Sequence, residues 1–161
     1  PMIIDADGLN ALAKNIALLK NAAAKLVLTP HPGEFARLPG LAISAIQKKR
    51  SFYAKSFAKK YKVCLVLKGH ASVVADSKGE VYVNDSGNPG MASGGVGDVL
   101  SGMIGAFLAQ GMEPFSAARL GVYVHGLAGD IAQKVKGEQG ILASDIGEMI
   151  PYTLEELKKH A

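Results

Sequence analysis

The sequence predicts an α/β fold in which helices cover both faces of a mostly parallel sheet. Three short apolar runs, Met2–Ile4, Lys25–Leu28 and Val63–Leu67, are continuous rather than alternating, as is typical of strands buried on both faces. Stretches with apolar residues at helical spacing separate these runs, which is the order of strands joined by crossover helices. The 19 glycines among 161 residues also suit a fold with many short loops that approach ligands closely.

The amino-terminal part begins with an apolar run and continues as a helix. Residues Pro1–Asp5 read as a buried strand, and natural chains rarely begin inside a core strand. We therefore expect the sequence to be a fragment of a longer polypeptide. A turn at Asp5–Gly8 follows, and a helix is expected from the spacing of Leu9, Leu12, Ile16 and Leu19.

The next part supplies two more buried strands, Lys25–Leu28 and Val63–Leu67. Between them, Thr29–Glu34 contains two prolines in three residues, which predicts a rigid loop rather than a strand or a helix. Residues 43–61 predict one helix that carries Ile46, Tyr53 and Phe57 on one side.

The remaining elements are a hairpin and three helices. Ala71–Ala75 and Glu80–Val83 predict a hairpin that turns at Asp76–Gly79. A polar, glycine-rich loop is expected over residues 84–94. Helices are predicted at about 96–110, 114–136 and 143–160, with Pro151 kinking or restarting the last.

Composition restricts the class of protein. Hydrophobic residues make up 48% and charged residues 20%, which fits a globular core and excludes a disordered chain. The sequence has no signal peptide and no apolar stretch of membrane-spanning length, so we expect a cytoplasmic location and no membrane partner. Cys64 is the only cysteine; it lies in an apolar run, where we expect a buried thiol.

The net charge of +4 is concentrated in one stretch of the chain. A solvated helix face is the preferred interpretation, and attraction of an anionic substrate is the alternative. We expect no nucleic-acid partner. The basic residues of this stretch are Lys48, Lys49, Arg50, Lys55, Lys59, Lys60 and Lys62.

The segment Asn88–Asp98 is the first candidate site. Its glycines let backbone N–H groups point at a phosphate, and the helix that follows adds partial positive charge at its N-terminus. Asp98 falls in the first turn, where it either caps the helix or takes a proton from an attacking hydroxyl. A Walker A loop is excluded because Val96 and Gly97 stand where Lys and Ser or Thr are required. A dinucleotide-binding fingerprint is also excluded, because after Gly95 and Gly97 it requires a glycine at position 100, which is Leu100.

Polar residues at the ends of the predicted strands are further candidates, because ligands of open parallel sheets bind at the carboxyl ends of strands. Lys68 is well placed for a phosphate, although an ordinary strand-end lysine would look the same. His31 is held in the proline-flanked loop, and both a functional and an incidental role remain open. Asp5 and Asp7 could hold Mg²⁺ through water, but turn residues are the preferred interpretation.

Taken one at a time, the other histidines are not expected to be catalytic residues or metal ligands. His125 is expected to be a satisfied core residue, His70 a loop residue and His160 a tail residue. No two histidines, cysteines or carboxylates show the spacing of metal ligands, so no metal ligand is placed.

The motifs together resemble the ADP/ATP-dependent NAD(P)H-hydrate dehydratases, which form the carboxy-terminal domain of YjeF-type repair enzymes. Any one motif is weak, but five in the right order are specific, and the resemblance covers nearly the whole chain. The matching segments are Asp5–Asn10, Leu28–Glu34, Leu67–Gly69, Gly87–Ala92 running into Gly97–Gly102, and Gly140–Ile146.

The resemblance implies a ribokinase-like fold and a cofactor-repair reaction. Residues 1–161 would form a single domain that lacks the family's amino-terminal portion. ADP, or ATP, would phosphorylate the hydroxyl of the S-epimer of NADH or NADPH hydrate, so that phosphate leaves in place of hydroxide. With ADP the products are NAD(P)H, phosphate and AMP, and Mg²⁺ is expected to accompany the nucleotide. The family also allows a homo-oligomer and a fused or separate epimerase domain.

The resemblance also implies roles for particular residues. Asp98 resembles the base that takes the hydroxyl proton and contacts the hydrate, and His31 resembles a second hydrate-contacting position. Gly94, Gly95 and Gly97 resemble the anion hole for the transferred phosphoryl group. The implied nucleotide-binding residues are Lys68, Gly69, His70, Ala71, Ser72 and Gly97.

Two other functions remain open on the sequence. One is a small-molecule kinase of the same fold, acting on a vitamin precursor or a sugar. The other is a truncated nucleotide-binding module without catalysis. Thr29–Glu34 and Asn88–Ala92 favour the dehydratase over the kinase.

Overall fold

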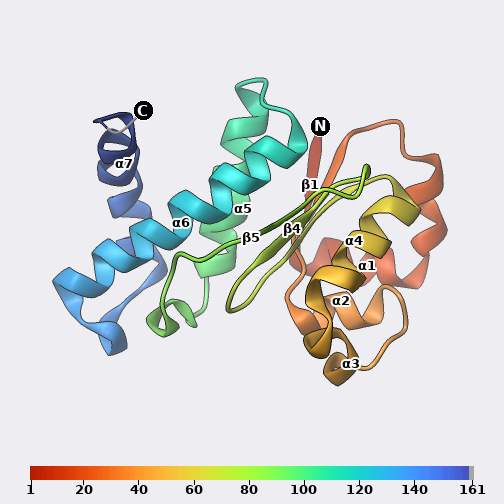
Figure 1. Cartoon of the computed structure of the whole chain (residues 1–161), viewed down its shortest axis with the longest axis horizontal. Helices are drawn as coiled ribbons and strands as arrows, with labels where there is room; N and C mark the ends of the chain where they lie inside the picture. The colour runs from red at the N-terminus through yellow and green to blue at the C-terminus, as the bar shows by residue number, and fades with distance from the viewer. Residues whose placement is uncertain (160–161) are drawn as a thin grey trace.

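The computed structural model describes residues 1–159, and its centre is a five-stranded sheet in the order β1-β2-β3-β4-β5 (Figure 1). The first three strands are parallel, and the last two form an antiparallel hairpin beside β3. This confirms the predicted mostly parallel sheet and the hairpin. The strands are β1 (Met2–Ile4), β2 (Leu26–Leu28), β3 (Cys64–Leu67), β4 (Val73–Ala75) and β5 (Val81–Val83).

Helices cover both faces of the sheet, with the early helices on one side and the late ones on the other (Figure 1). One face carries α1 (Ala6–Lys14), the 3₁₀ turn η1 (Ile16–Asn21), α2 (Pro32–Arg37), α3 (Ile43–Lys48) and α4 (Arg50–Tyr61). The other face carries α5 (Val96–Ala109) and α6 (Pro114–Lys136), with α7 (Ala143–Lys159) packed on α6. Short turns η2 (Pro89–Met91) and η3 (Glu138–Gly140) lie near each other.

The central strands are apolar throughout because alternate side chains enter two separate cores. In β3, Leu65 and Leu67 join the cluster under α1–α4, whereas Cys64 and Val66 join the cluster under α5 and α6. Cys64 is 5% exposed, which confirms the expected buried thiol, and burial raises its pKa to about 12.

β1 differs from the expected buried strand, because it lies at the edge of the sheet. It pairs only with β2, and Met2 is 53% exposed while Ile3 and Ile4 are partly buried. The apolar composition of the run signals a strand but does not distinguish an edge strand from a central one.

Two predicted helices are each divided. The stretch 43–61 breaks at Lys49, whose φ and ψ of −143° and 51° end α3 before α4 begins. The helix expected through Leu19 ends at Lys14 and continues as η1 after Asn15. Apolar spacing persists across both breaks, so periodicity alone predicted continuous helices.

The loop expected over Thr29–Glu34 is partly helical, which corrects that prediction. Pro32 occupies the first position of α2, where its missing N–H has no intrahelical partner to lose. In contrast, α7 continues through Pro151 without restarting. The expected end of that helix at residue 160, and His160 itself, lie outside the described residues.

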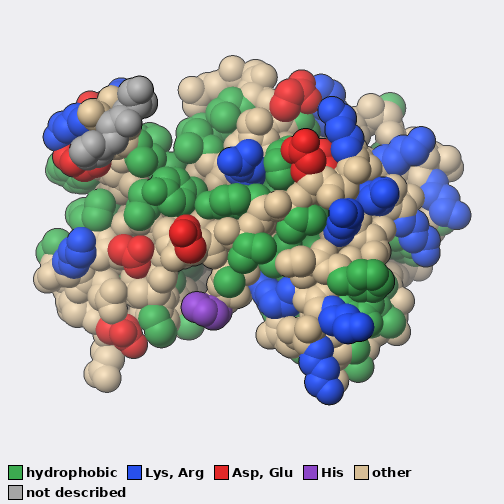
Figure 2. All heavy atoms as spheres, viewed as in Figure 1, with side chains coloured by type: hydrophobic (Ala, Val, Ile, Leu, Met, Phe, Trp, Pro, Cys, Tyr) green, Lys and Arg blue, Asp and Glu red, His purple; other side chains and the backbone are tan. Residues whose placement is uncertain are grey.

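The lysines of the basic stretch are all exposed, which confirms a solvated helix face for them. Blue side chains are prominent on the side of Figure 2 that carries the early helices. Arg50 departs from this pattern because it is half-buried and bonded to the end of β3. No helix within residues 1–159 is long and apolar enough to cross a membrane.

Candidate active site

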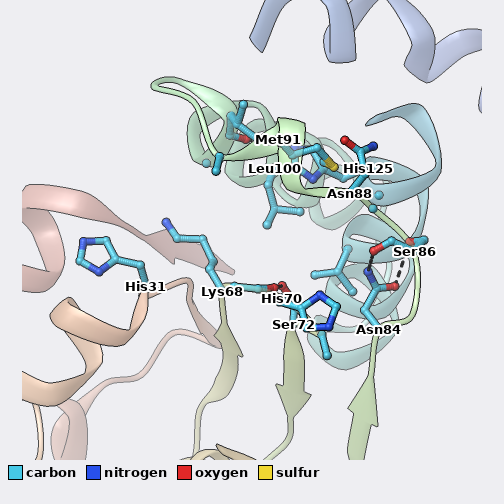
Figure 3. A pocket seen from close by; sticks show the side chains of 18 of the residues that line it. His31, Lys68, His70, Ser72, Asn84, Ser86, Asn88, Met91, Leu100 and His125 are labelled. Atoms are coloured by element: carbon cyan, nitrogen blue, oxygen red, sulfur yellow. Dashed lines mark hydrogen bonds between the residues drawn. The ribbon is translucent and has the colours of Figure 1, made fainter. Parts of the chain in front are cut away.

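A cavity of about 530 Å³ lies at the carboxyl ends of β3 and β5, at the edge of the sheet where the sequence predicts a ligand. Its walls come from the start of α2, the turn after β3, the segment after β5, the N-terminus of α5 and the middle of α6 (Figure 3). Most of the lining is apolar, with polar groups at a few positions, as is typical of a small-molecule site.

The glycine loop reaches this cavity at the start of α5. Gly95 has a φ of +83°, a conformation that favours glycine, and its carbonyl accepts the N–H groups of Asp98 at 3.0 Å and Val99 at 3.1 Å. The first N–H groups of the helix have no intrahelical acceptor and are free for an anion. Gly97 lines the cavity, and a Cβ placed on it would stand 3.2 Å from Lys68 Nζ. The structure thus brings Lys68 to the helix N-terminus.

Lys68 is held there by Asp5, at the end of β1. Lys68 Nζ donates to Asp5 Oδ1 at 2.8 Å, and Ser101 Oγ donates to Asp5 Oδ2 at 2.5 Å. Burial acts to raise the pKa of Asp5, but the hydrogen bonds from Lys68 and Ser101 and the lysine charge outweigh it, so the pKa lies below its usual value. Thr29, at the end of β2, contacts Ser101 with 3.3 Å between hydroxyl oxygens.

Asp5 also begins α1, because its carboxylate accepts the Ala6 N–H at 2.8 Å. Asp5 is thus the N-cap of α1, and Asp7 lies exposed in the first turn of the helix. Among residues 1–159 no three His, Cys, Asp or Glu side chains gather to hold a metal ion.

His31 both caps α2 and lines the cavity. Its Nδ1 accepts the N–H groups of Gly33 at 3.0 Å and Glu34 at 3.2 Å, and the Glu34 carboxylate accepts the His31 N–H at 2.8 Å. This reciprocal cap fixes the ring, leaving Nε2 on the exposed side, 3.5 Å from Glu34 Oε1. The imidazole is therefore rigidly mounted at the rim of the cavity.

His125 is the satisfied buried residue that the sequence predicts, but it also lines the cavity. Its Nε2 lies 3.0 Å from the carbonyl oxygen of Val96, which can only accept, so Nε2 carries the proton. Burial lowers the pKa of His125 to about 4, although the hydrogen bond to Val96 acts in the opposite direction. The ring is thus neutral at neutral pH, and it supports the backbone next to Gly97.

Two further polar residues have roles that were not predicted from the sequence, where Arg50 was named only as part of the basic stretch. Arg50 Nη2 donates to the carbonyls of Leu67 at 2.9 Å and Lys68 at 3.3 Å, and so holds the end of β3. Asp130 on α6 binds the segment after β5 by accepting from Gly87 N at 3.0 Å and Asn88 Nδ2 at 2.9 Å. Both partnerships are distant in the chain, so no local motif signals them.

Most of the residues predicted for the site meet at the cavity, although their roles remain predictions. Gly94, Gly95 and Asp98 do not line its wall; all three are exposed and lie within the same loop and helical turn as Gly97. The predicted residues that do line it are His31, Lys68, Gly69, His70, Ala71, Ser72 and Gly97.

A model of one protein family, the NAD(P)H-hydrate dehydratases, matches residues 1–152. The chain belongs to this family. The match agrees with the resemblance carried by the five motifs, and it spans both the sheet and the candidate site.

Curated relatives of the chain carry names that specify the reaction. It is 45% identical over 159 residues to the bifunctional NAD(P)H-hydrate repair enzyme Nnr of Moorella thermoacetica, covering 99% of this chain and 30% of that one. It is 42% identical over 162 residues to the ADP-dependent (S)-NAD(P)H-hydrate dehydratase of Neisseria meningitidis serogroup B, covering 99% and 55%. The chain thus spans about half the length of the latter relative.

Solved structures agree with the expected ribokinase-like fold of the chain. The ADP/ATP-dependent NAD(P)H-hydrate dehydratase of Bacillus subtilis, co-crystallised with ATP and Mg²⁺, is 33% identical with a TM-score of 0.85, covering 97% of this chain and 56% of that one. A hydroxyethylthiazole kinase from Pyrococcus horikoshii is 17% identical with a TM-score of 0.74, covering 93% and 59%. At that identity the kinase supports the fold alone.

Proposed function

We propose that this protein carries out the ADP-dependent dehydration of the S-epimer of NAD(P)H hydrate, and so repairs the nicotinamide cofactor. The observation that carries the proposal is the meeting of Lys68 and Gly97 at a cavity beside Asp98 in a member of the dehydratase family. A lysine and free helix N–H groups suit the phosphates of a nucleotide, and an exposed carboxylate one residue further along suits proton removal.

The proposed reaction divides the dehydration into two steps. The hydrate hydroxyl attacks the terminal phosphoryl group of ADP while Asp98 takes the hydroxyl proton, which gives AMP and a phosphorylated hydrate. The ring nitrogen's electron pair then expels phosphate, and loss of a proton from the neighbouring ring carbon restores the double bond. Lys68 and the N–H groups at Gly94–Gly97 would stabilise the charge on the transferred phosphoryl group.

Mg²⁺ and the nucleotide fit the groups that this site offers. When bound, Mg²⁺ would neutralise charge on the phosphate oxygens, and it usually keeps several waters and takes few protein ligands. A site without a carboxylate cluster suits a metal of that kind, which arrives with the nucleotide. Lys68 and the start of α5 would hold the phosphates.

The test is recovery of the 340 nm absorbance of NADH from the S-epimer of NADH hydrate with ADP and Mg²⁺. We expect absorbance to return and AMP and phosphate to form in equal amounts. ATP in place of ADP shows which donor is preferred. If no absorbance returns while a vitamin precursor or a sugar is phosphorylated, the chain is a kinase; binding of ADP without either reaction would indicate a binding module.

A further inference from the structure

The segment Gly87–Met91 follows β5 and forms one wall of the cavity, yet the proposed reaction gives it no role. It is bound to α6 by a single carboxylate. Asp130 Oδ2 accepts from Gly87 N at 3.0 Å, and Asp130 Oδ1 accepts from Asn88 Nδ2 at 2.9 Å. Asn88 Oδ1 in turn accepts from Gly90 N at 3.1 Å, which fixes the orientation of the Asn88 amide.

The surface of α6 is shaped to receive this segment closely. A Cβ on Gly126 would collide with Ser86, and a Cβ on Gly129 would collide with the Met91 sulfur. Asp130 directly follows Gly129. The close contact of Gly129 with Met91 and the two hydrogen bonds of Asp130 therefore hold the same segment, Gly87–Met91, against α6. Gly87 has a φ of +98°, which lets its N–H reach the carboxylate.

We propose that Asp130 is a positioning residue for the nucleotide, which it serves by holding Gly87–Met91 as a fixed wall of the cavity. Across the cavity lie Lys68–Ser72, and the segment runs on into the glycine loop at Gly97. A displaced wall therefore changes the shape of the site around the nucleotide and leaves the Asp98 carboxylate in place. The proposal rests on the proposed function for its kinetic readout.

The pair Asn88 and Asp130 permits an exchange experiment. Asp130→Asn places two amide donors against each other, and Asn88→Asp places two carboxylates together. The double variant Asn88→Asp/Asp130→Asn restores a donor opposite an acceptor, keeps an acceptor for Gly87 N–H, and has the net charge of the wild type. Asp85→Asn is the matched control, because Asp85 is exposed, lies just before the segment and undergoes the same chemical change.

Each single variant should raise the KM for ADP by about tenfold, since loss of a partly buried hydrogen-bond partner of a charged group has an effect of that order. We expect kcat to stay within about twofold, the double variant to recover most of the loss, and Asp85→Asn to match the wild type. The Kd for ADP, measured by titration calorimetry, should rank the variants in the same order as the KM. Thermal unfolding shows whether each variant is folded.

Three results would overturn the proposal: an unchanged KM and Kd in both single variants, a fall in kcat alone, or a double variant no better than the worse single variant. The two single variants are independent, so one that fails to fold leaves the other as a test. If the wild type turns over no hydrate, the proposed function fails, while calorimetry still decides the role of Asp130.

Discussion

Asp98 is exposed in the first turn of α5, and no side chain among residues 1–159 donates a hydrogen bond to it. Its carboxylate is therefore free to accept a proton from a substrate. Asp5, which pairs with the cavity-lining Lys68, instead has its oxygens occupied by Lys68, Ser101 and Ala6. The two aspartates look alike in the sequence. Their partners decide which one is available for chemistry.

Replacement of the Asp98 carboxylate should remove turnover and spare nucleotide binding. Asp98→Asn keeps the shape of the side chain but cannot take the hydroxyl proton, so kcat should fall on the order of 10²–10⁴-fold. The Kd for ADP, measured by calorimetry, should change little because the N–H groups and Lys68 remain. Asp85→Asn serves as the control, and an Asp98→Asn variant with wild-type kcat would show that another group is the base.

His125 should make stability depend on pH. Its pKa of about 4 in the fold lies below the ordinary value of 6.5, so the unfolded chain binds more protons between these values. Stability is therefore fully present above pH 6.5 and falls as the pH drops towards 4, by roughly 2–3 kcal/mol at most. Urea unfolding at pH 7 and 4.5 measures the loss.

His125→Gln retains an amide N–H for the Val96 carbonyl but does not titrate. The difference in unfolding free energy between the two pH values should therefore be smaller in this variant than in the wild type. If both proteins lose the same free energy between pH 7 and 4.5, His125 is not the group responsible.

At the scale of elements, α6 contributes more to the site than its sequence suggests. It presents His125 to the glycine loop and Asp130 to the segment after β5, and between them its glycines let that segment approach closely. Glycine in the middle of a helix ordinarily lowers stability relative to alanine. On α6, however, glycine is required at positions 126 and 129, because a side chain there would collide with Ser86 or Met91.

Gly129→Ala should therefore be unfavourable despite the better helix propensity of alanine. Its Cβ would displace Met91 and with it the cavity wall, so both the unfolding free energy and the affinity for ADP should fall. Gly102→Ala on α5 is the matched control, since nothing lies within 4 Å of its Cβ and stability should rise by about 1 kcal/mol. Equal, positive changes in both variants would show that Met91 moves aside at no cost.

At the scale of the whole molecule, the features that could be predicted from the sequence are those that depend on neighbouring residues, namely the strands and the hairpin. The apolar runs around Val27 and Val66 indicate strands buried on both faces, and the turn at Asp76–Gly79 indicates the hairpin. The pairs Asn88–Asp130 and Asp5–Lys68 are 42 and 63 residues apart, so only the folded chain brings them together. The proline-flanked loop was predicted as rigid, but the first turn of α2 was not recognised.

The Asp5 carboxylate joins the two layers of the molecule, because Lys68 ends a central strand and Ser101 lies on α5. Asp5→Asn should lower the unfolding free energy by about 2 kcal/mol at pH 7, since Lys68 is left without a counter-ion at a site where its side chain is 18% exposed. The pKa of Asp5 is lowered by folding, so its stabilisation is present above the unfolded value of 3.8 and is lost as the pH falls through the folded pKa.

The measurement is a double-mutant cycle of Asp5→Asn and Lys68→Met, followed by urea unfolding at pH 7 and at pH 3. If the ion pair is what connects the layers, Asp5→Asn should cost much less stability in the Lys68→Met background than in the wild type. The difference between wild type and Asp5→Asn should also shrink at pH 3, because below pH 3.8 the unfolded wild-type chain takes up a proton at Asp5 and the variant does not, which favours unfolding of the wild type only. If the effects of the two substitutions on unfolding free energy are additive at pH 7, Asp5 stabilises the fold only through Ser101 and the start of α1. Lys68 would then be available to bind the nucleotide without loss of stability.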